Sequence, residues 1–240
     1  MSADMSGWLA QALATDSPVL PTHFAMQVWL HLGWSVVLAW LGANLSGRWL
    51  AGRARGVQGQ WLIAVGLAVW AWVPGPSGAA YWLGLAFQAP SVVGVVVCAL
   101  LLGVRLRGAH GLPVPVALPA STRLTDGRVL LLAVTGVLAG WALLLDSFAV
   151  LPLSLYAWGF SPAALGVVVL IALLPWVAGL HLSQAGSSWL VAVVPLSALV
   201  FVVWRLPTGN VWDAVLDPWA WFVLQGWLVK QSLQRYKNNS

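Results

Sequence analysis

Long apolar segments alternate with short polar ones along the chain, a pattern typical of membrane-spanning helices. A helix needs about 20 consecutive apolar residues to cross the hydrocarbon core of a bilayer. Seven segments approach or reach this length: 22–44, 60–73, 81–104, 127–151, 162–180, 188–204 and 218–229. The last becomes long enough only if it continues toward Leu233, so six spans remain an alternative. The pattern predicts an all-α integral membrane bundle of about seven transmembrane helices.

These spans divide the chain into three parts. We expect residues 1–21 to form a short outer segment, residues 22–233 a single transmembrane bundle, and residues 234–240 a basic cytoplasmic tail. The first segment contains Asp4 and Asp16 and lacks the basic start of a signal peptide. Its residues 8–13 have the composition of a short interfacial helix.

The composition excludes most soluble classes of protein. Hydrophobic residues make up 60% of the 240 residues and charged residues only 7%, whereas soluble domains carry roughly a quarter charged residues. A soluble enzyme and a nucleic-acid partner are therefore excluded. The single cysteine, Cys98, excludes an intrachain disulfide and a multi-cysteine metal site.

The distribution of basic residues predicts the orientation. With seven spans, Arg205 lies on one side, and the other ten basic residues lie on the opposite side: Arg48, Arg53, Arg55, Arg105, Arg107, Arg123, Arg128, Lys230, Arg235 and Lys237. Because basic residues gather in cytoplasmic loops, the N-terminus is expected outside and the C-terminus in the cytoplasm. We expect a multi-pass protein of the bacterial inner membrane.

Proline and small polar residues mark the predicted helix ends. Ser161-Pro162 and Asp217-Pro218 each combine an N-cap side chain with proline at the first helical position. Pro195 falls inside the sixth span, where its ring is expected to bend the helix.

The third and fifth predicted spans share a sequence pattern. The pattern Pro-x-x-x-Gly-Val-Val-Val occurs at 90–97 and again at 162–169. It suggests helical hairpins related by parallel repetition. Chance is the alternative, because a chain built mainly from Leu, Val, Ala, Gly and Trp produces short matches without common origin.

Few charged residues are candidates for chemistry within the predicted bundle. Arg205, Asp146, Asp213 and Asp217 all lie on the predicted outer side and form a candidate site for substrate binding or gating. Asp146 either pairs with Arg205 or is solvated. No carboxylate is expected at the membrane midplane, which argues against transport driven by protons or sodium.

Histidines and tryptophans offer a possible cofactor site. His23 and His31 lie on the first span, about 12 Å apart along a helix, and are candidate haem or quinone ligands. No two histidines match in depth, so a structural role is the alternative. Most of the 18 tryptophans fall near predicted helix ends, where an aromatic belt explains them.

Small residues at helical spacing indicate close helix packing. Gly136 and Gly140 are four residues apart in the fourth span, and Gly94 and Cys98 repeat the spacing in the third. This pattern lets two backbones approach closely, either within this chain or against another subunit.

These observations rank three functions. No nucleophile–base pair and no metal-ligand cluster is recognisable, so catalysis and a metal site are not expected. The first expectation is a non-catalytic inner-membrane subunit or assembly factor that contacts lipid and other membrane subunits, or self-associates. The alternatives are a small permease for a neutral or amphipathic solute, and a haem- or quinone-handling protein.

Overall fold

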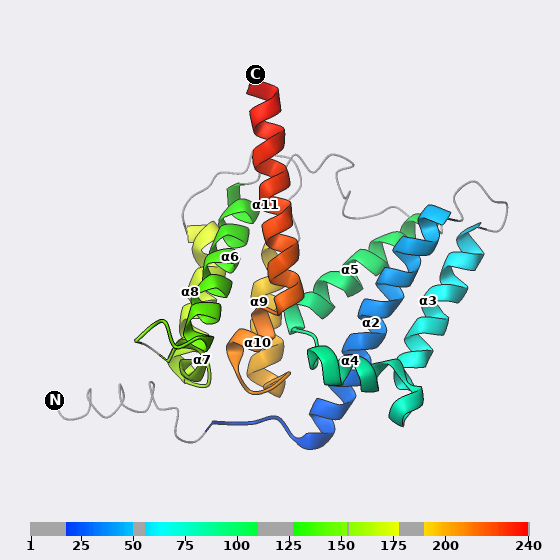
Figure 1. The fold of residues 1–240 in the computed structure, drawn as a ribbon, viewed down its shortest axis with the longest axis horizontal. Coiled ribbons are helices and arrows are strands. Elements are labelled where there is room, and N and C mark those ends of the chain that lie inside the picture. The colour runs from blue at the N-terminus through cyan, green and yellow to red at the C-terminus, as the bar shows by residue number, and fades with distance from the viewer. Residues whose placement is uncertain (1–17, 50–55, 110–126, 153, 178–189, 240) are drawn as a thin grey trace.

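The computed structural model describes residues 18–49, 56–109, 127–152, 154–177 and 190–239, and every regular element within these ranges is helical (Figure 1). The first four α-helices are α2 (His23–Trp49), α3 (Gly56–Trp72), α4 (Ala79–Phe87) and α5 (Val92–Ala109). The later long helices are α6 (Gly127–Ser147), α8 (Pro162–Val177), α9 (Leu190–Trp204) and α11 (Pro218–Asn239). The short elements are η1 (Gly75–Ser77), α7 (Leu155–Trp158) and α10 (Val211–Val215). The all-α class predicted from the sequence is confirmed.

Two of the described helices are long and apolar enough to cross a membrane, the segments His23–Gly47 and Leu130–Ser147. Three further apolar helices are shorter, Val57–Trp72, Pro162–Leu174 and Ala192–Trp204. The remaining long helices, α5 and α11, carry arginine or lysine near their C-terminal ends. Length and composition therefore identify two candidate spans among the described residues, fewer than the seven predicted.

The prediction of one continuous helix over 81–104 is wrong. The structure divides this segment into α4 and α5, which are separated by residues 88–91. Pro90 provides the reason, because the residue before a proline is disfavoured in helical conformation and proline donates no backbone hydrogen bond. The chain leaves α4 at Gln88, whose φ is +61° in the left-handed region.

The two predicted proline-adjacent caps are confirmed. The Ser161 hydroxyl accepts a hydrogen bond from the Ala164 amide at 3.2 Å, and the Asp217 carboxylate accepts one from the Ala220 amide at 2.6 Å. The last helix is longer than predicted and continues to residue 239, through most of the expected tail. Its final turns are rich in Gln, Lys and Arg, which are good helix formers. The predicted interfacial helix at 8–13 lies outside the described residues.

The helices form two groups that meet along α5 (Figure 1). In the first group, α2 packs along α3, where the alanines Ala39, Ala43 and Ala64 are buried and allow close approach. In the second group, α6 packs against α8, α9 and α11, while the short helix α7 contacts α6 and the short helix α10 contacts α8 and α9. Residues from both groups, including Val92, Val95 and Phe201, form the largest buried apolar cluster. This cluster holds the two halves together.

Two helices, α5 and α11, begin inside the bundle. Figure 1 shows their N-terminal ends about half-way along it, above the lower ends of α2, α3 and α9. At about 1.5 Å per residue, Val92 lies roughly 20 Å along α5 from Arg105, and Pro218 lies roughly 18 Å along α11 from Lys230. Polar groups at these two helix starts therefore lie within the bundle.

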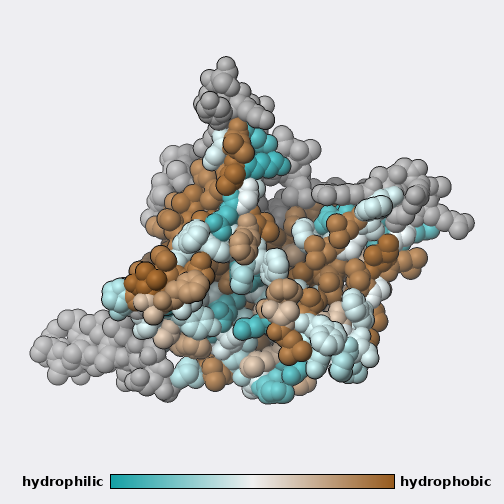
Figure 2. All heavy atoms as spheres, viewed as in Figure 1, coloured by the Kyte–Doolittle hydropathy of each residue, from teal (hydrophilic) through white to brown (hydrophobic). Residues whose placement is uncertain are grey.

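The outward surface of the long helices is largely apolar, as Figure 2 shows for one face. On α3, for example, Leu62, Val65 and Val69 are exposed at a spacing that places them on one side of the helix. A contiguous apolar surface of this kind is normal for a helix in contact with lipid or with another membrane protein.

Candidate functional site

The carbonyl groups at the break between α4 and α5 are satisfied by tryptophans of α2. The indole Nε1 of Trp34 donates to the carbonyl oxygen of Gln88 at 2.9 Å, and that of Trp29 donates to the carbonyl oxygen of Pro90 at 3.0 Å. Both indoles are buried. Irregular backbone inside a bundle costs free energy unless its polar groups find partners, and these two side chains supply them.

The start of α5 is tied to the start of α11 through Asp217. Its Oδ2 accepts hydrogen bonds from the Ser91 hydroxyl at 2.7 Å and from the Ser91 amide at 3.2 Å. Its Oδ1 accepts the Ala220 amide, so one carboxylate serves two helix N-termini. Negative charge is stabilised at helix N-termini, and Ser91 is fully buried. We call Ser91, Gly94 and Asp217 the junction site.

Gly94 allows the carboxylate to approach α5. The Gly94 amide donates to the Ser91 hydroxyl at 3.0 Å, which completes the N-cap of α5. A Cβ atom at Gly94 would lie 3.0 Å from both Oδ2 of Asp217 and Oγ of Ser91. Gly94, which the sequence predicts as a packing residue, is therefore part of the junction site.

The other two aspartates of the predicted group meet at Tyr156 on α7. The Tyr156 hydroxyl donates to Oδ2 of Asp213 at 2.9 Å, and the Tyr156 amide donates to Oδ2 of Asp146 at 2.8 Å. Thr208 donates to the same oxygen of Asp213 at 2.6 Å. Burial and then the Asp213 carboxylate raise the pKa of Tyr156 above its ordinary value. This cluster fixes the loop around α7 to α6 and α10.

A buried asparagine completes this cluster, which we call the Tyr156 cluster. Asn210 caps α10 by accepting the Trp212 amide at 3.0 Å, and its Nδ2 donates to the carbonyl oxygen of Tyr156 at 2.8 Å. It is fully buried, and its two bonds tie α10 to α7.

Arg205 does not join the aspartates. Arg205 directly follows the last residue of α9 and has a φ of +55°. Its guanidinium carbon lies 5.3 Å from the centroid of the Phe201 ring. Within the described residues it forms no ion pair with Asp146, Asp213 or Asp217. The four residues of the predicted group therefore lie in three places. Asp217 is in the junction site, Asp146 and Asp213 are in the Tyr156 cluster, and Arg205 is at the end of α9.

The same face of α9 carries an unpaired hydroxyl. Ser197 is fully buried and lies one helical turn from Phe201, and its Oγ has no hydrogen-bond partner among the described residues. Buried hydroxyl groups are normally paired. Ser197 therefore leaves hydrogen-bonding capacity unused inside the bundle.

The histidines of α2 do not form a pair. His31 Nδ1 is 2.8 Å from the carbonyl oxygen of Gln27, and its ring lies 5.5 Å from that of Trp72. Because a carbonyl only accepts, Nδ1 carries a proton in this bond. His23 is exposed at the start of the same helix, two turns away. Over the described part of the chain, no three His, Cys, Asp or Glu side chains are grouped to hold a metal ion.

The paired glycines of α6 face α11. A Cβ atom at Gly136 would meet Leu224 at 3.1 Å, and one at Gly140 would overlap the indole of Trp221. The Trp221 indole also donates to the carbonyl oxygen of Val137 at 3.2 Å. Both glycines therefore receive side chains of this chain's own last helix.

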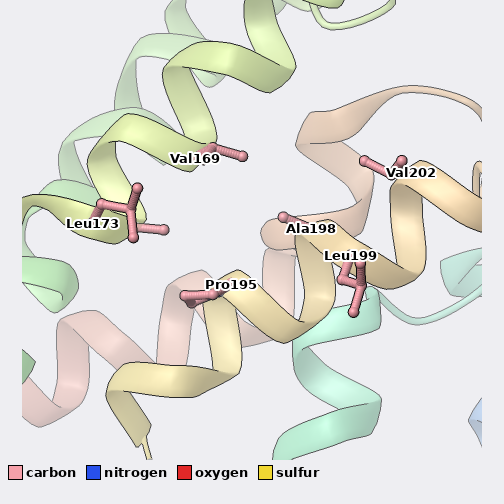
Figure 3. Close-up of a pocket in the computed structure, with 7 residues that line it drawn as sticks. Val169, Leu173, Pro195, Ala198, Leu199 and Val202 are labelled. Carbon is pink, nitrogen blue, oxygen red and sulfur yellow. The ribbon is translucent and has the colours of Figure 1, made fainter.

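A wholly apolar groove lies between α8 and α9 (Figure 3). It has a volume of about 220 Å³ and is lined by Val169, Ala172, Leu173, Pro195, Ala198, Leu199 and Val202. None of these side chains offers a hydrogen bond or a charge to orient a polar solute. The polar candidate site is therefore the junction site.

Sequence reasoning missed Ser91, Trp29 and Trp34. The signal that points to them is Gln88-Ala-Pro-Ser91 within an apolar segment, since proline there requires a break and a break requires hydrogen-bond partners. Tyr156 and Asn210 have no comparable signal, because their partners lie far away in the sequence.

The chain matches no protein-family model, no curated protein and no solved structure.

Proposed function

We propose that this chain is a multi-pass protein of the bacterial inner membrane that carries a small neutral or amphipathic solute across it, and that the junction site is where the solute binds. The observation that carries the proposal is the interrupted helix α4–α5, whose second part starts inside the bundle against the Asp217 carboxylate. Interrupted helices with polar groups at their ends are how many transporters build a substrate site within the membrane.

The depth of the junction site supports this role. If Arg105 and Lys230 mark the cytoplasmic boundary, the starts of α5 and α11 lie roughly 18–20 Å into a hydrocarbon layer about 30 Å thick. An ionisable side chain at such depth is a functional hypothesis by default. Asp217 then lies deeper than the outer position that its place in the sequence suggests.

The position between two helix groups also favours a carrier. Ser91 belongs to the first group and Asp217 to the second, so the junction site changes whenever the groups move relative to each other. Ser197 adds an unpaired hydroxyl on α9, which packs against α5 where the groups meet. Alternating access requires a site whose walls belong to parts that move against each other.

Proteoliposomes containing the purified protein alone test the proposal. Uptake of radiolabelled glycerol, urea and alanine is compared among wild type, Asp217→Asn and empty liposomes. The expected result is uptake of at least one solute by wild type and a reduction of about tenfold or more in Asp217→Asn. In the variant, one of the two carboxylate oxygens is replaced by an amide donor, which faces the donors of either Ser91 or Ala220.

Ser232→Ala is the matched control on the same helix, because the Ser232 hydroxyl is exposed and bonds only to the carbonyl oxygen of Leu228 within the described residues. It should keep wild-type uptake. Wild-type uptake equal to that of empty liposomes for all three solutes would reject the carrier. Full uptake by folded Asp217→Asn would reject the junction site.

A second candidate is the non-catalytic subunit or assembly factor. The exposed face of α3, with Leu62, Val65 and Val69, is the surface it would offer to a partner subunit. Native mass spectrometry of the protein released in mild detergent distinguishes the two. Defined partner masses favour the subunit, and a lone monomer or homo-oligomer favours the carrier.

A further inference from the structure

A separate polar cluster surrounds the guanidinium of Arg105, near the C-terminal end of α5. Nη1 donates to Oδ1 of Asn44 on α2 at 2.9 Å, and Nη2 donates to Oε1 of Gln60 on α3 at 2.8 Å. Three helices therefore hold one guanidinium in a fixed orientation. Both acceptors are neutral amides, so these bonds leave the positive charge in place.

Gly47 provides the space for this arrangement. A Cβ atom there would overlap Nη2 of Arg105, so a larger residue would displace the guanidinium from its amide partners. Gly47 lies two residues before Trp49, the last residue of α2, and it faces Arg105 of α5.

The surroundings of Arg105 combine positive charge with exposed apolar side chains. Arg107 is exposed on the same helix, as are Leu100, which comes five residues before Arg105, and Leu106, which follows it. The described aspartates lie on other elements: Asp146 is in the last turn of α6, Asp213 is in α10, and Asp217 precedes α11. A ligand that suits this place carries a negative head and an apolar tail.

We propose that Arg105 binds the phosphate group of an anionic phospholipid in the cytoplasmic leaflet. A guanidinium has five N–H donors in a planar fork that matches phosphate oxygens, and Asn44 and Gln60 occupy two of them. Basic sites between helices on the cytoplasmic side are a common mode of anionic lipid binding. The inference rests on the membrane placement proposed above and is independent of solute transport.

Native mass spectrometry of the detergent-solubilised protein with added lipid tests this. Phosphatidylglycerol is compared with phosphatidylcholine of the same acyl chains and with inorganic phosphate at equal concentration. Wild type should retain phosphatidylglycerol preferentially. Arg105→Gln should lower its apparent affinity about fivefold, the factor for one basic residue near an anionic membrane surface.

Arg107→Gln is the matched control, since it removes the same charge from an exposed position two residues away. It should reduce lipid retention less than Arg105→Gln. Equal losses in both variants would show a general charge effect and overturn the proposal. Undiminished retention by Arg105→Gln would also overturn it, as would displacement of the lipid by inorganic phosphate.

Gly47→Ala covers the case in which Arg105→Gln does not fold. It keeps the charge but moves the guanidinium, and it should also lower phosphatidylglycerol retention. Wild-type retention in folded Gly47→Ala would overturn the fixed-guanidinium site. Because lipid retention is measured without any transport step, a failure of the carrier proposal leaves this result unaffected.

Discussion

Two helices of this protein begin with a serine N-cap, but only one of the two serines also forms a hydrogen bond to the start of another helix. Ser91 caps α5 and Ser161 caps α8, and each hydroxyl accepts the amide three residues later. The Ser91 hydroxyl also donates to Asp217 at 2.7 Å, whereas no carboxylate accepts from Ser161 among the described residues. The Ser161 cap therefore stabilises one helix, while the Ser91 cap joins two halves of the molecule.

The shared sequence pattern does not align these two caps. Pro90 precedes the capping serine of α5, whereas Pro162 follows that of α8. The two prolines are 72 residues apart, whereas the two serines are 70 residues apart. Superposing the prolines therefore displaces the caps by two residues, and repetition of hairpins stays a prediction.

The largest single loss of stability is expected in Ser91→Ala, and Ser161→Ala is the variant to compare it with. Loss of the local cap should cost about 1 kcal/mol in both variants. Ser91→Ala should cost about 2 kcal/mol in total, because Asp217 also loses a charge-assisted hydrogen bond. Unfolding by sodium dodecyl sulfate in mixed micelles, followed by tryptophan fluorescence, measures both. Equal costs would show that the Asp217 bond contributes nothing to stability.

Gly94→Ala and Gly166→Ala should change stability in opposite directions. The Cβ at Gly94 lies 3.0 Å from two polar oxygens, which must move, at a cost of about 1 kcal/mol. The Cβ at Gly166 meets nothing within 4 Å, so alanine there should stabilise α8 by about 0.5 kcal/mol through helix propensity. The same unfolding assay compares them. A destabilised Gly166→Ala would mean that this face of α8 is packed.

The smallest expected effect concerns Tyr156 on α7, which lies in the same helix group as Asp217 but bonds to Asp213 and Asp146 instead. Its pKa is raised in the folded state, so its contribution to stability is complete below pH 10 and is lost as the pH rises above that value. Tyr156→Phe should therefore lose less stability than wild type between pH 10 and 11. Unfolding curves at pH 8, 10 and 11 measure the difference, and identical slopes would contradict the raised pKa.

The sequence predicts the all-α class and the caps at Ser161 and Asp217, because these depend on hydropathy and on side chains next to the helix they cap. It does not predict the partner of Asp217, since Ser91 is 126 residues away. The break at Gln88 was missed because mean hydropathy stays high through Pro90, although the proline itself marks the break.

The candidate site was only partly foreseen for the same reason. The sequence predicts Asp217 as an N-cap and as part of an outer binding or gating group, and Gly94 as a packing residue, but it does not predict that the two lie together. The indoles of Trp29 and Trp34 donate hydrogen bonds to the carbonyl groups of the irregular backbone at the break, which removes the cost of burying those groups unpaired. These partners are far away in the sequence, so the residue pattern does not predict them.

The Ser91–Asp217 bond also sets an order for biogenesis. A ribosome adds about 5–20 residues per second, so the 126 residues between these partners take about 6–25 s to synthesise. Until then α5 lacks its carboxylate partner, and another group must satisfy the amides at its N-terminus. Asp217, at the start of α11, therefore completes the N-terminus of a helix that is synthesised much earlier.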